Sequence, residues 1–200
     1  NKGIVMKDLI EESKQESMDE CKTYWAGSYF EFLKPFSLDE RGKWGERLIY
    51  KLLQSSGSKS YWDGDNNTDP VDGIYDIWVL VEMLKKRVEV KTAMRGTLGE
   101  SWQHEHVYGS PDIWDKLVFL DLDYDKLYLT VFDYEDMVWD RKNPITGRKP
   151  TLRKDSKNSY KVDMGGATLR KTLSTGYTFQ HVLGEDQTLL TDFLRNKIEK

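Results

Sequence analysis

One stretch near the middle of the chain decides the fold: DIWVLVEMLKKRVEVKTA, residues Asp76–Ala93. Residues 77–83 and 88–93 are rich in β-branched and apolar side chains, and the basic residues 85–87 separate the two runs. This pattern predicts a β-hairpin with its turn at the three basic residues. Folding the hairpin returns the second strand to the start of the first.

Three charged residues of this hairpin form a candidate site: Asp76, Glu89 and Lys91. Glu89 and Lys91 are two positions apart on a strand and therefore share a face, while Val88 and Val90 point to the core. Phosphodiester hydrolysis needs charge stabilised on an anionic phosphate and a hydroxide produced, which carboxylate-bound Mg²⁺ does well. Asp76 and Glu89 are candidate metal ligands, and Lys91 would orient or deprotonate water. An isolated Glu-x-Lys is usually an ordinary surface pair, so the surroundings matter.

A helix upstream adds a third carboxylate. Ser37-Leu38-Asp39-Glu40 matches a capping box and predicts a helix from there to about Gln54. Glu46 begins an apolar stripe on this helix, which continues with Ile49, Tyr50 and Leu53. A carboxylate that points inward must be paired or bound to metal, so Glu46 is a candidate ligand. The alternative places Glu46 at the edge of the stripe, paired with Lys43 or Lys51.

The other patterns predict an α/β fold with a central mixed β-sheet flanked by helices. The expected elements are an N-terminal helical region over 4–33, a hairpin over 117–132, a short helix over 133–139, a strand over 176–183 and a C-terminal helix after Gly184. We expect one domain over residues 1–200. Its parts are the helical region 1–36, a catalytic core 37–140, a basic segment 141–175 and a terminal strand and helix 176–200.

Charge is distributed unevenly. The net charge is −4, but residues 1–140 hold 17 basic and 28 acidic side chains, while residues 141–171 hold ten basic and two acidic ones. A local basic stretch is what binding to a polyanion requires. The alternative is a solvated loop. The candidate phosphate contacts in or near this stretch are Lys142, Arg148, Lys149, Arg153, Lys154, Lys157 and Lys161.

The motifs together resemble those of the PD-(D/E)XK nucleases, which include type II restriction endonucleases and archaeal Holliday-junction resolvases. The resemblance covers residues 42–132 and lies in Gly45-Glu46, in Asp76-Ile77-Trp78-Val79 and in Glu89-Val90-Lys91. It implies a restriction-endonuclease-like fold in which Asp76 and Glu89 bind Mg²⁺, with Mn²⁺ able to substitute. By the same resemblance, Lys91 positions the water and Glu46 completes or tunes the metal site.

One departure from the family pattern leaves the first aspartate open. Asp76 follows Tyr75, not a proline, whereas Pro70 precedes Val71 and Asp72. Asp72 is therefore a rival. We prefer Asp76, because an apolar strand starts immediately after it.

Polar residues beyond the second strand form a further candidate group. Gln103 lies where many relatives in this superfamily carry a glutamine near the metal, so it is a further candidate catalytic residue. His104 and His106 lack the partners that a tetrahedral zinc site needs, and we interpret them as polar loop residues near DNA.

The resemblance implies a Mg²⁺-dependent endodeoxyribonuclease that cuts double-stranded DNA, with a type II restriction endonuclease, acting as a homodimer, as the first choice. The alternatives are a structure-specific junction or repair nuclease, a phage-encoded nuclease, or an inactive DNA-binding module. The single cysteine, Cys21, and the lack of a long apolar run indicate a cytoplasmic protein without membrane association.

Overall fold

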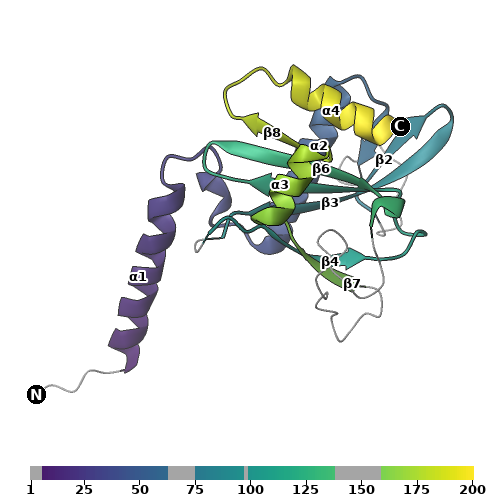
Figure 1. Ribbon diagram of the computed structural model, residues 1–200. Helices are drawn as coiled ribbons and strands as arrows, with labels where there is room; N and C mark the ends of the chain where they lie inside the picture. Colours follow the sequence, from purple (N-terminus) through teal and green to yellow (C-terminus); the bar gives the residue numbers. More distant parts are fainter. Residues whose placement is uncertain (1–5, 63–74, 97–98, 138–158) are drawn as a thin grey trace, which may run out of the picture.

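The computed structural model describes residues 6–62, 75–96, 99–137 and 159–200 (Figure 1). At its centre lies a six-stranded sheet in the order β1-β2-β3-β5-β6-β8. Its strands are β1 (Ser60–Trp62), β2 (Ile77–Val81), β3 (Leu84–Met94), β5 (Lys116–Leu122), β6 (Lys126–Asp133) and β8 (Thr178–Val182). β3 and β5 are parallel, and the other neighbouring pairs are antiparallel. The sheet is therefore mixed.

Each face of this sheet has its own cover. Helices α2 (Leu38–Ser55) and α4 (Thr188–Glu199) pack on one face, against Val88, Val90 and the apolar residues of β5 and β6. The other face packs against a two-stranded sheet of β4 (Gln103–Tyr108) and β7 (Ser159–Asp163), and against helix α3 (Ala167–Ser174). The prediction of an α/β fold with a mixed sheet flanked by helices is confirmed.

The N-terminal region is helical but not continuous. Helix α1 (Met6–Trp25) extends away from the body of the molecule (Figure 1). It ends before Gly27, whose φ of +80° leaves the helical region, and a short 3-10 helix, η1 (Glu31–Leu33), follows. In the part of the chain that the structure describes, no helix is long and apolar enough to cross a membrane.

Helix α2 begins as the capping box predicts. The Ser37 hydroxyl accepts the Glu40 N–H at 3.2 Å, and the Glu40 carboxylate accepts the Ser37 N–H at 2.7 Å. Gly45 is buried where α2 meets β3, and a Cβ atom there would lie 1.8 Å from Thr92 Oγ1. The absence of a side chain at Gly45 therefore lets α2 approach β3 closely enough to bring Glu46 beside the sheet.

The central hairpin forms, but the predicted position of its turn is wrong. Val81 pairs with Leu84, so the turn consists of Glu82 and Met83, whose φ angles are +47° and +73°. Two left-handed residues are the geometry of a tight hairpin turn that matches strand twist. Lys85-Lys86-Arg87 lies within β3 instead, because the end of the hairpin is exposed and tolerates charged strand residues.

The remaining local predictions have mixed outcomes. The hairpin β5–β6, the late strand β8 and the terminal helix α4 are confirmed. Of the helix expected over 133–139, the described part up to Met137 contains a 3-10 turn, η2 (Tyr134–Asp136), and no longer helix. The interpretation of His104 and His106 as loop residues is wrong, because both lie in strand β4, which pairs with β7. The basic segment contains β7 and α3, which the charge pattern did not indicate.

Candidate active site

The candidate site lies where β2 begins. Ile77 pairs with Val88, which places Asp76 one step earlier, opposite Glu89. The Asp76 N–H donates to the Val88 carbonyl at 3.1 Å, and the Asp76 carboxylate accepts the Val90 N–H at 2.7 Å. The backbone of β3 therefore holds the Asp76 carboxylate beside the strand that carries Glu89 and Lys91.

Glu89 and Lys91 form an ion pair on one face of β3. Lys91 Nζ lies 2.6 Å from Glu89 Oε1. The Lys91 side chain is 22% exposed, and the Glu89 side chain is 7% exposed. Burial raises the pKa of Glu89, a shift that Lys91 reduces and the negative charge of Glu46 increases. Burial opposes the charge on Lys91, but Glu89 and Asp76 outweigh it and raise the Lys91 pKa. Lys91 is therefore a cation in this arrangement, suited to orienting water or an anionic oxygen.

The surroundings of Asp76 disfavour its charged form. Its pKa is raised well above the ordinary value, first by burial and then by the charges of Glu89 and Glu46. The hydrogen bond from Val90 and the charge of Lys91 offset only part of this effect. A divalent cation would relieve such a concentration of carboxylates, and strongly shifted carboxylates are common at functional sites.

Glu46 reaches the site from α2. Its carboxylate accepts the indole N–H of Trp62 at 3.0 Å, and the side chain is partly buried. Over the ranges 6–62 and 75–96, neither Lys43 nor Lys51 forms an ion pair with Glu46. The hydrogen bond to Trp62 thus replaces the edge pairing that the sequence left open.

The arrangement of possible ligands is limited. Among the described residues, no group of three or more His, Cys, Asp or Glu side chains lies close enough together to hold a metal ion. The electrostatic effect of Glu46 on Asp76 and Glu89 is nevertheless present. Asp76 and Glu89 are therefore the two carboxylates that β2 and β3 bring together, and the role of Glu46 as a ligand stays a prediction.

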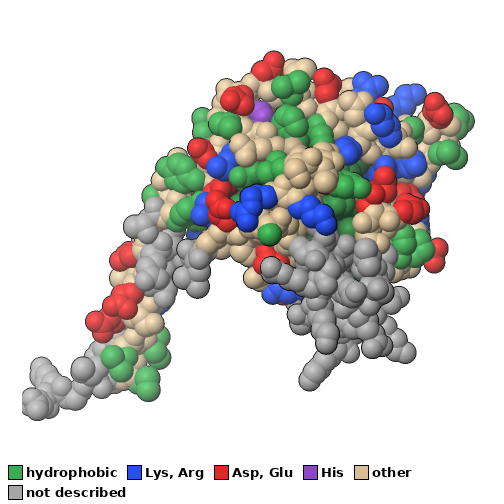
Figure 2. Space-filling model, viewed as in Figure 1, with side chains coloured by type: hydrophobic (Ala, Val, Ile, Leu, Met, Phe, Trp, Pro, Cys, Tyr) green, Lys and Arg blue, Asp and Glu red, His purple; other side chains and the backbone are tan. Residues whose placement is uncertain are grey.

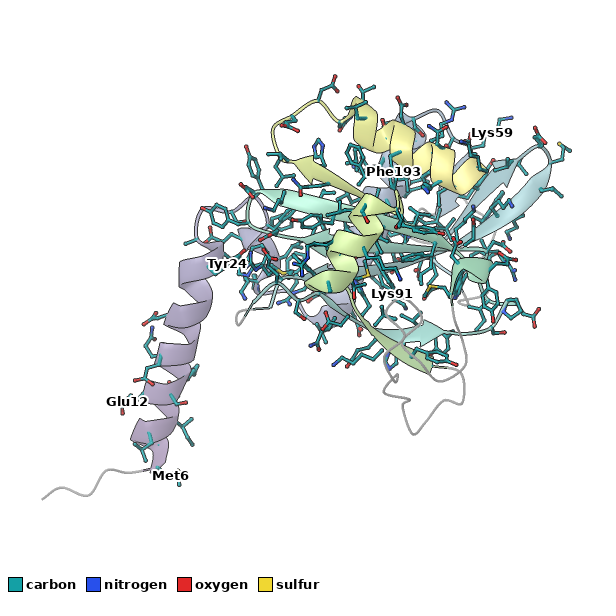
Figure 3. The ribbon with its side chains drawn as sticks, viewed as in Figure 1. Met6, Glu12, Tyr24, Lys59, Lys91 and Phe193 are labelled. Carbon is teal, nitrogen blue, oxygen red and sulfur yellow. The ribbon has the colours of Figure 1, made fainter. Side chains whose placement is uncertain are left out.

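A cleft of about 640 Å³ opens onto this site. Its walls are residues of α2 between Leu38 and Glu46, residues 90–92 and 94 of β3, and residues 103–106 of β4. Asp76 also lines it. Lys91 lies on the side of the central sheet that faces β4 (Figure 3). The pairing of β2 with β3 starts at Ile77 and Val88, whereas β3 continues beyond Val88 to Met94. The edge of this part of β3 that does not pair with β5 therefore opens onto the cleft.

Strand β4 places the candidate glutamine in the cleft and reveals an unexpected histidine. Gln103 is exposed and lines the same cleft as Asp76 and Lys91. His104 is not a loop residue: it is buried, its Nε2 lies 2.7 Å from Asp121 Oδ1, and its ring stacks on Phe119 at 4.1 Å. Burial raises the pKa of Asp121, and His104 offsets part of that shift.

A signal for this pair was present in the sequence. Asp121 interrupts the apolar run 117–122, and a carboxylate inside a buried strand needs a partner. The partner could not be identified without the tertiary structure. His104 lines the cleft as well, so the pair joins the cleft wall to the central sheet.

Most of the predicted DNA contacts lie outside the described residues. Lys142, Arg148, Lys149, Arg153, Lys154 and Lys157 lie in 138–158, and the rival Asp72 lies in 63–74, both outside the described residues. Lys161 lies on β7, with its Nζ 3.7 Å from Glu105. On the face that Figure 2 shows, the described basic and acidic side chains are interspersed.

Comparison with solved structures finds likenesses to this chain, and the one described below is partial. No protein-family model and no curated protein matches the chain. A bacterial homing endonuclease, I-Ssp6803I, is similar over 50% of this chain and 70% of its own, with 15% identity and a TM-score of 0.35. A likeness this partial carries no weight for function, which must be inferred from the site.

Proposed function

We propose that this chain is a divalent-metal-dependent endodeoxyribonuclease. One observation carries the proposal: Asp76 lies opposite Glu89 where β2 begins, with Lys91 on the same face of β3 at an open cleft. Asp76 and Lys91 line this cleft, and the buried Glu89 is ion-paired with Lys91. Two carboxylates and a lysine are the groups that metal-assisted phosphodiester hydrolysis uses. Burial raises the pKa of both carboxyl groups, and the negative charge of Glu46 adds to the rise at each.

Mg²⁺ fits these donors, because it prefers oxygen ligands and needs few of them from the protein. Asp76 and Glu89 would hold it, and Mn²⁺ would substitute because carboxylates suit both metals. Bound there, the metal would supply Lewis-acid activation of water and neutralise charge on the phosphate. In the structure, Glu89 Oε1 is ion-paired with the ammonium group of Lys91.

The residues of the chain have separable roles in this proposal. The Val90 N–H holds the Asp76 carboxylate in place, and the Trp62 indole does the same for Glu46. The Lys91 ammonium donates a hydrogen bond to the attacking water or to a phosphate oxygen. Gln103, which is exposed in the cleft, forms hydrogen bonds with the attacking water or with a phosphate oxygen.

The substrate in this proposal is double-stranded DNA, cut at specific sequences as by a type II restriction endonuclease. A homodimer would place one site on each strand. Support for self-association comes from α1, which extends from the body and exposes Met6, Leu9 and Ile10. A junction-resolving, repair or phage-encoded nuclease would use the same site on another DNA shape.

The test is cleavage of mixed-sequence DNA with Mg²⁺ or Mn²⁺, followed by sequencing of the ends. Recurrent ends on linear duplex support restriction-type specificity, and cutting confined to branched DNA supports the structure-specific alternative. Glu89→Ala is the matched control and should bind DNA without cutting it. If wild type binds DNA but cuts none of these substrates with either metal, the chain is a DNA-binding module and the proposal is wrong.

A further inference from the structure

Two aromatic side chains and a lysine lie in a row across β1, β2 and β3, the three strands at one edge of the central sheet. Tyr61 on β1 pairs in register with Trp78 on β2, and their rings stack with centroids 3.9 Å apart and planes at 15°. Lys85 on β3 places its Nζ 5.0 Å from the Trp78 ring and 5.2 Å from the Tyr75 ring. We call these residues the Tyr61–Trp78–Lys85 row.

The row shares a face with the candidate active site. Trp78 is two residues after Asp76, and Lys85 is four residues before Glu89, so strand alternation directs all four side chains to one side. Ile77 and Val79 take the opposite side and pack in the core with α2 and α4. Two residues along a strand span about 7 Å, so Trp78 stands about one nucleotide step from Asp76.

Each residue of the row lacks one further kind of contact within the described residues. Lys85 is exposed and forms no ion pair with a carboxylate there, unlike Arg87 and Lys91 on the same face. The Trp78 indole N–H is buried without a hydrogen-bond partner. Tyr61 lies on β1, the terminal strand of the sheet, and Trp78 is its only ring contact in the part described.

Tyr61 is partly exposed, and Lys85 presents an exposed ammonium group beside the rings of Trp78 and Tyr75. A nucleotide can use both, since the π-face of its base stacks on an aromatic ring and its phosphate attracts an ammonium group. Rings that stand up from neighbouring strands stack along the direction that joins the strands. A base added to this row would therefore stack on the outer face of Tyr61.

We propose that the Tyr61–Trp78–Lys85 row binds an unpaired nucleobase beside the phosphate that is cut, with the base on Tyr61 and Lys85 on a phosphate. The inference rests on the proposed nuclease function and names its substrate more closely. Within the double-stranded DNA of that proposal, the preferred substrate carries an unpaired or extruded base next to the cleavage position. A fully paired duplex offers no free base face and would bind less well.

The test compares two duplexes of one sequence that carry 2-aminopurine, in one as an unpaired bulge and in the other paired. Binding is measured in chelator, so that no cleavage occurs. Wild type should bind the bulged duplex about tenfold more tightly, and its fluorescence should be quenched by stacking. Tyr61→Leu should lose the preference and the quenching, while Tyr61→Phe should keep both.

A second variant keeps the test independent of folding at β1. Lys85→Met retains the alkyl chain, removes the ammonium and should weaken binding of the bulged duplex severalfold. Lys197→Met is the matched control, because Lys197 Nζ lies 5.1 Å from the Tyr177 ring, a similar pair next to β8 at the other edge of the sheet. This control should bind like wild type.

The outcomes separate this inference from the proposed function. Equal affinity of wild type for the two duplexes overturns the base-binding site, as does full binding by a folded Tyr61→Leu or by Lys85→Met. If wild type cuts paired DNA with Mg²⁺ but shows no preference, only the base-binding site is wrong. If the preference is present and depends on Tyr61 but no DNA is cut, only the nuclease function is wrong.

Discussion

The carboxylate of Asp76 accepts a 2.7 Å hydrogen bond from the backbone N–H of Val90, the residue between Glu89 and Lys91. The Val90 side chain is buried on the opposite face, in the core with α2 and α4. A single strand therefore presents Glu89 and Lys91 through its side chains and positions Asp76 through its backbone. Catalytic groups on a packed strand are held more precisely than groups on a loop.

Asp76→Asn should abolish cleavage and stabilise the metal-free protein. Asparagine can still accept the Val90 N–H, but it removes a carboxylate whose pKa burial and the charges of Glu89 and Glu46 raise. We expect cleavage activity to fall at least about a hundredfold. We also expect a higher unfolding midpoint in chelator, by about 2–4 °C for each kcal/mol gained in the free energy of unfolding of a chain of this size. Mg²⁺ should raise the midpoint of wild type only. A Mg²⁺ shift of equal size in the variant would contradict the assignment of Asp76 as a ligand.

Lys91→Met should separate metal binding from catalysis. The ammonium that interacts with Glu89 Oε1 is lost, so Glu89 becomes more available to a cation. We expect cleavage to fall about 10²–10⁴-fold, the range for removal of a group that assists proton transfer, while the Mg²⁺-induced rise in unfolding midpoint is kept or increased. Thermal unfolding with and without Mg²⁺, together with a cleavage assay, measures both quantities. Weaker Mg²⁺ binding would instead make Lys91 a structural partner of Glu89.

The buried pair His104–Asp121 should show strong coupling. Replacing His104 with Phe leaves the Asp121 carboxylate buried without its partner, which costs about 1–3 kcal/mol or more. The double variant His104→Phe with Asp121→Leu removes both polar groups and should be less destabilised than His104→Phe alone. Chemical denaturation of the four proteins in a double-mutant cycle measures the coupling. Additive effects would mean that the hydrogen bond contributes nothing.

Two glycines of α2 should respond in opposite directions to alanine. At Gly45 a Cβ would lie 1.8 Å from Thr92 Oγ1, so Gly45→Ala should destabilise the protein by about 1–3 kcal/mol through overpacking. At Gly42 a Cβ would have no neighbour within 4 Å, so Gly42→Ala should stabilise α2 by about 0.5–1 kcal/mol. Adding Thr92→Ala should recover part of the loss at Gly45. Equal effects at the two positions would show that α2 is not held this close to β3.

Local patterns in the sequence were sufficient for much of the fold and for the centre of the site. The capping box placed the start of α2, and alternation put Glu89 and Lys91 on one face with Val88 and Val90 on the other. These features depend on residues a few positions apart, whose relative directions follow from helix and strand geometry alone. The hairpin then had to bring Asp76 to Glu89, wherever its turn lay.

The position of the hairpin turn could not be predicted from the local sequence pattern. Three consecutive basic residues, 85–87, suggested a loop, yet Arg87 is held in β3 by Asp115, whose carboxylate lies 2.8 Å from its guanidinium. A charged strand residue is stable when a distant part of the chain pairs with it. The sequence alone does not state which distant residue that is.

The amino-acid sequence by itself determined the helix start, the hairpins and the side-chain alternation that places Glu89 and Lys91 together. Only the tertiary structure decided that His104 pairs with Asp121, that Gly45 packs on Thr92 and that Tyr61 stacks on Trp78. The first group follows from backbone geometry over a few residues. The second depends on which segments pack together, because burial makes an unpaired polar group or an overlapping atom costly only after those segments meet.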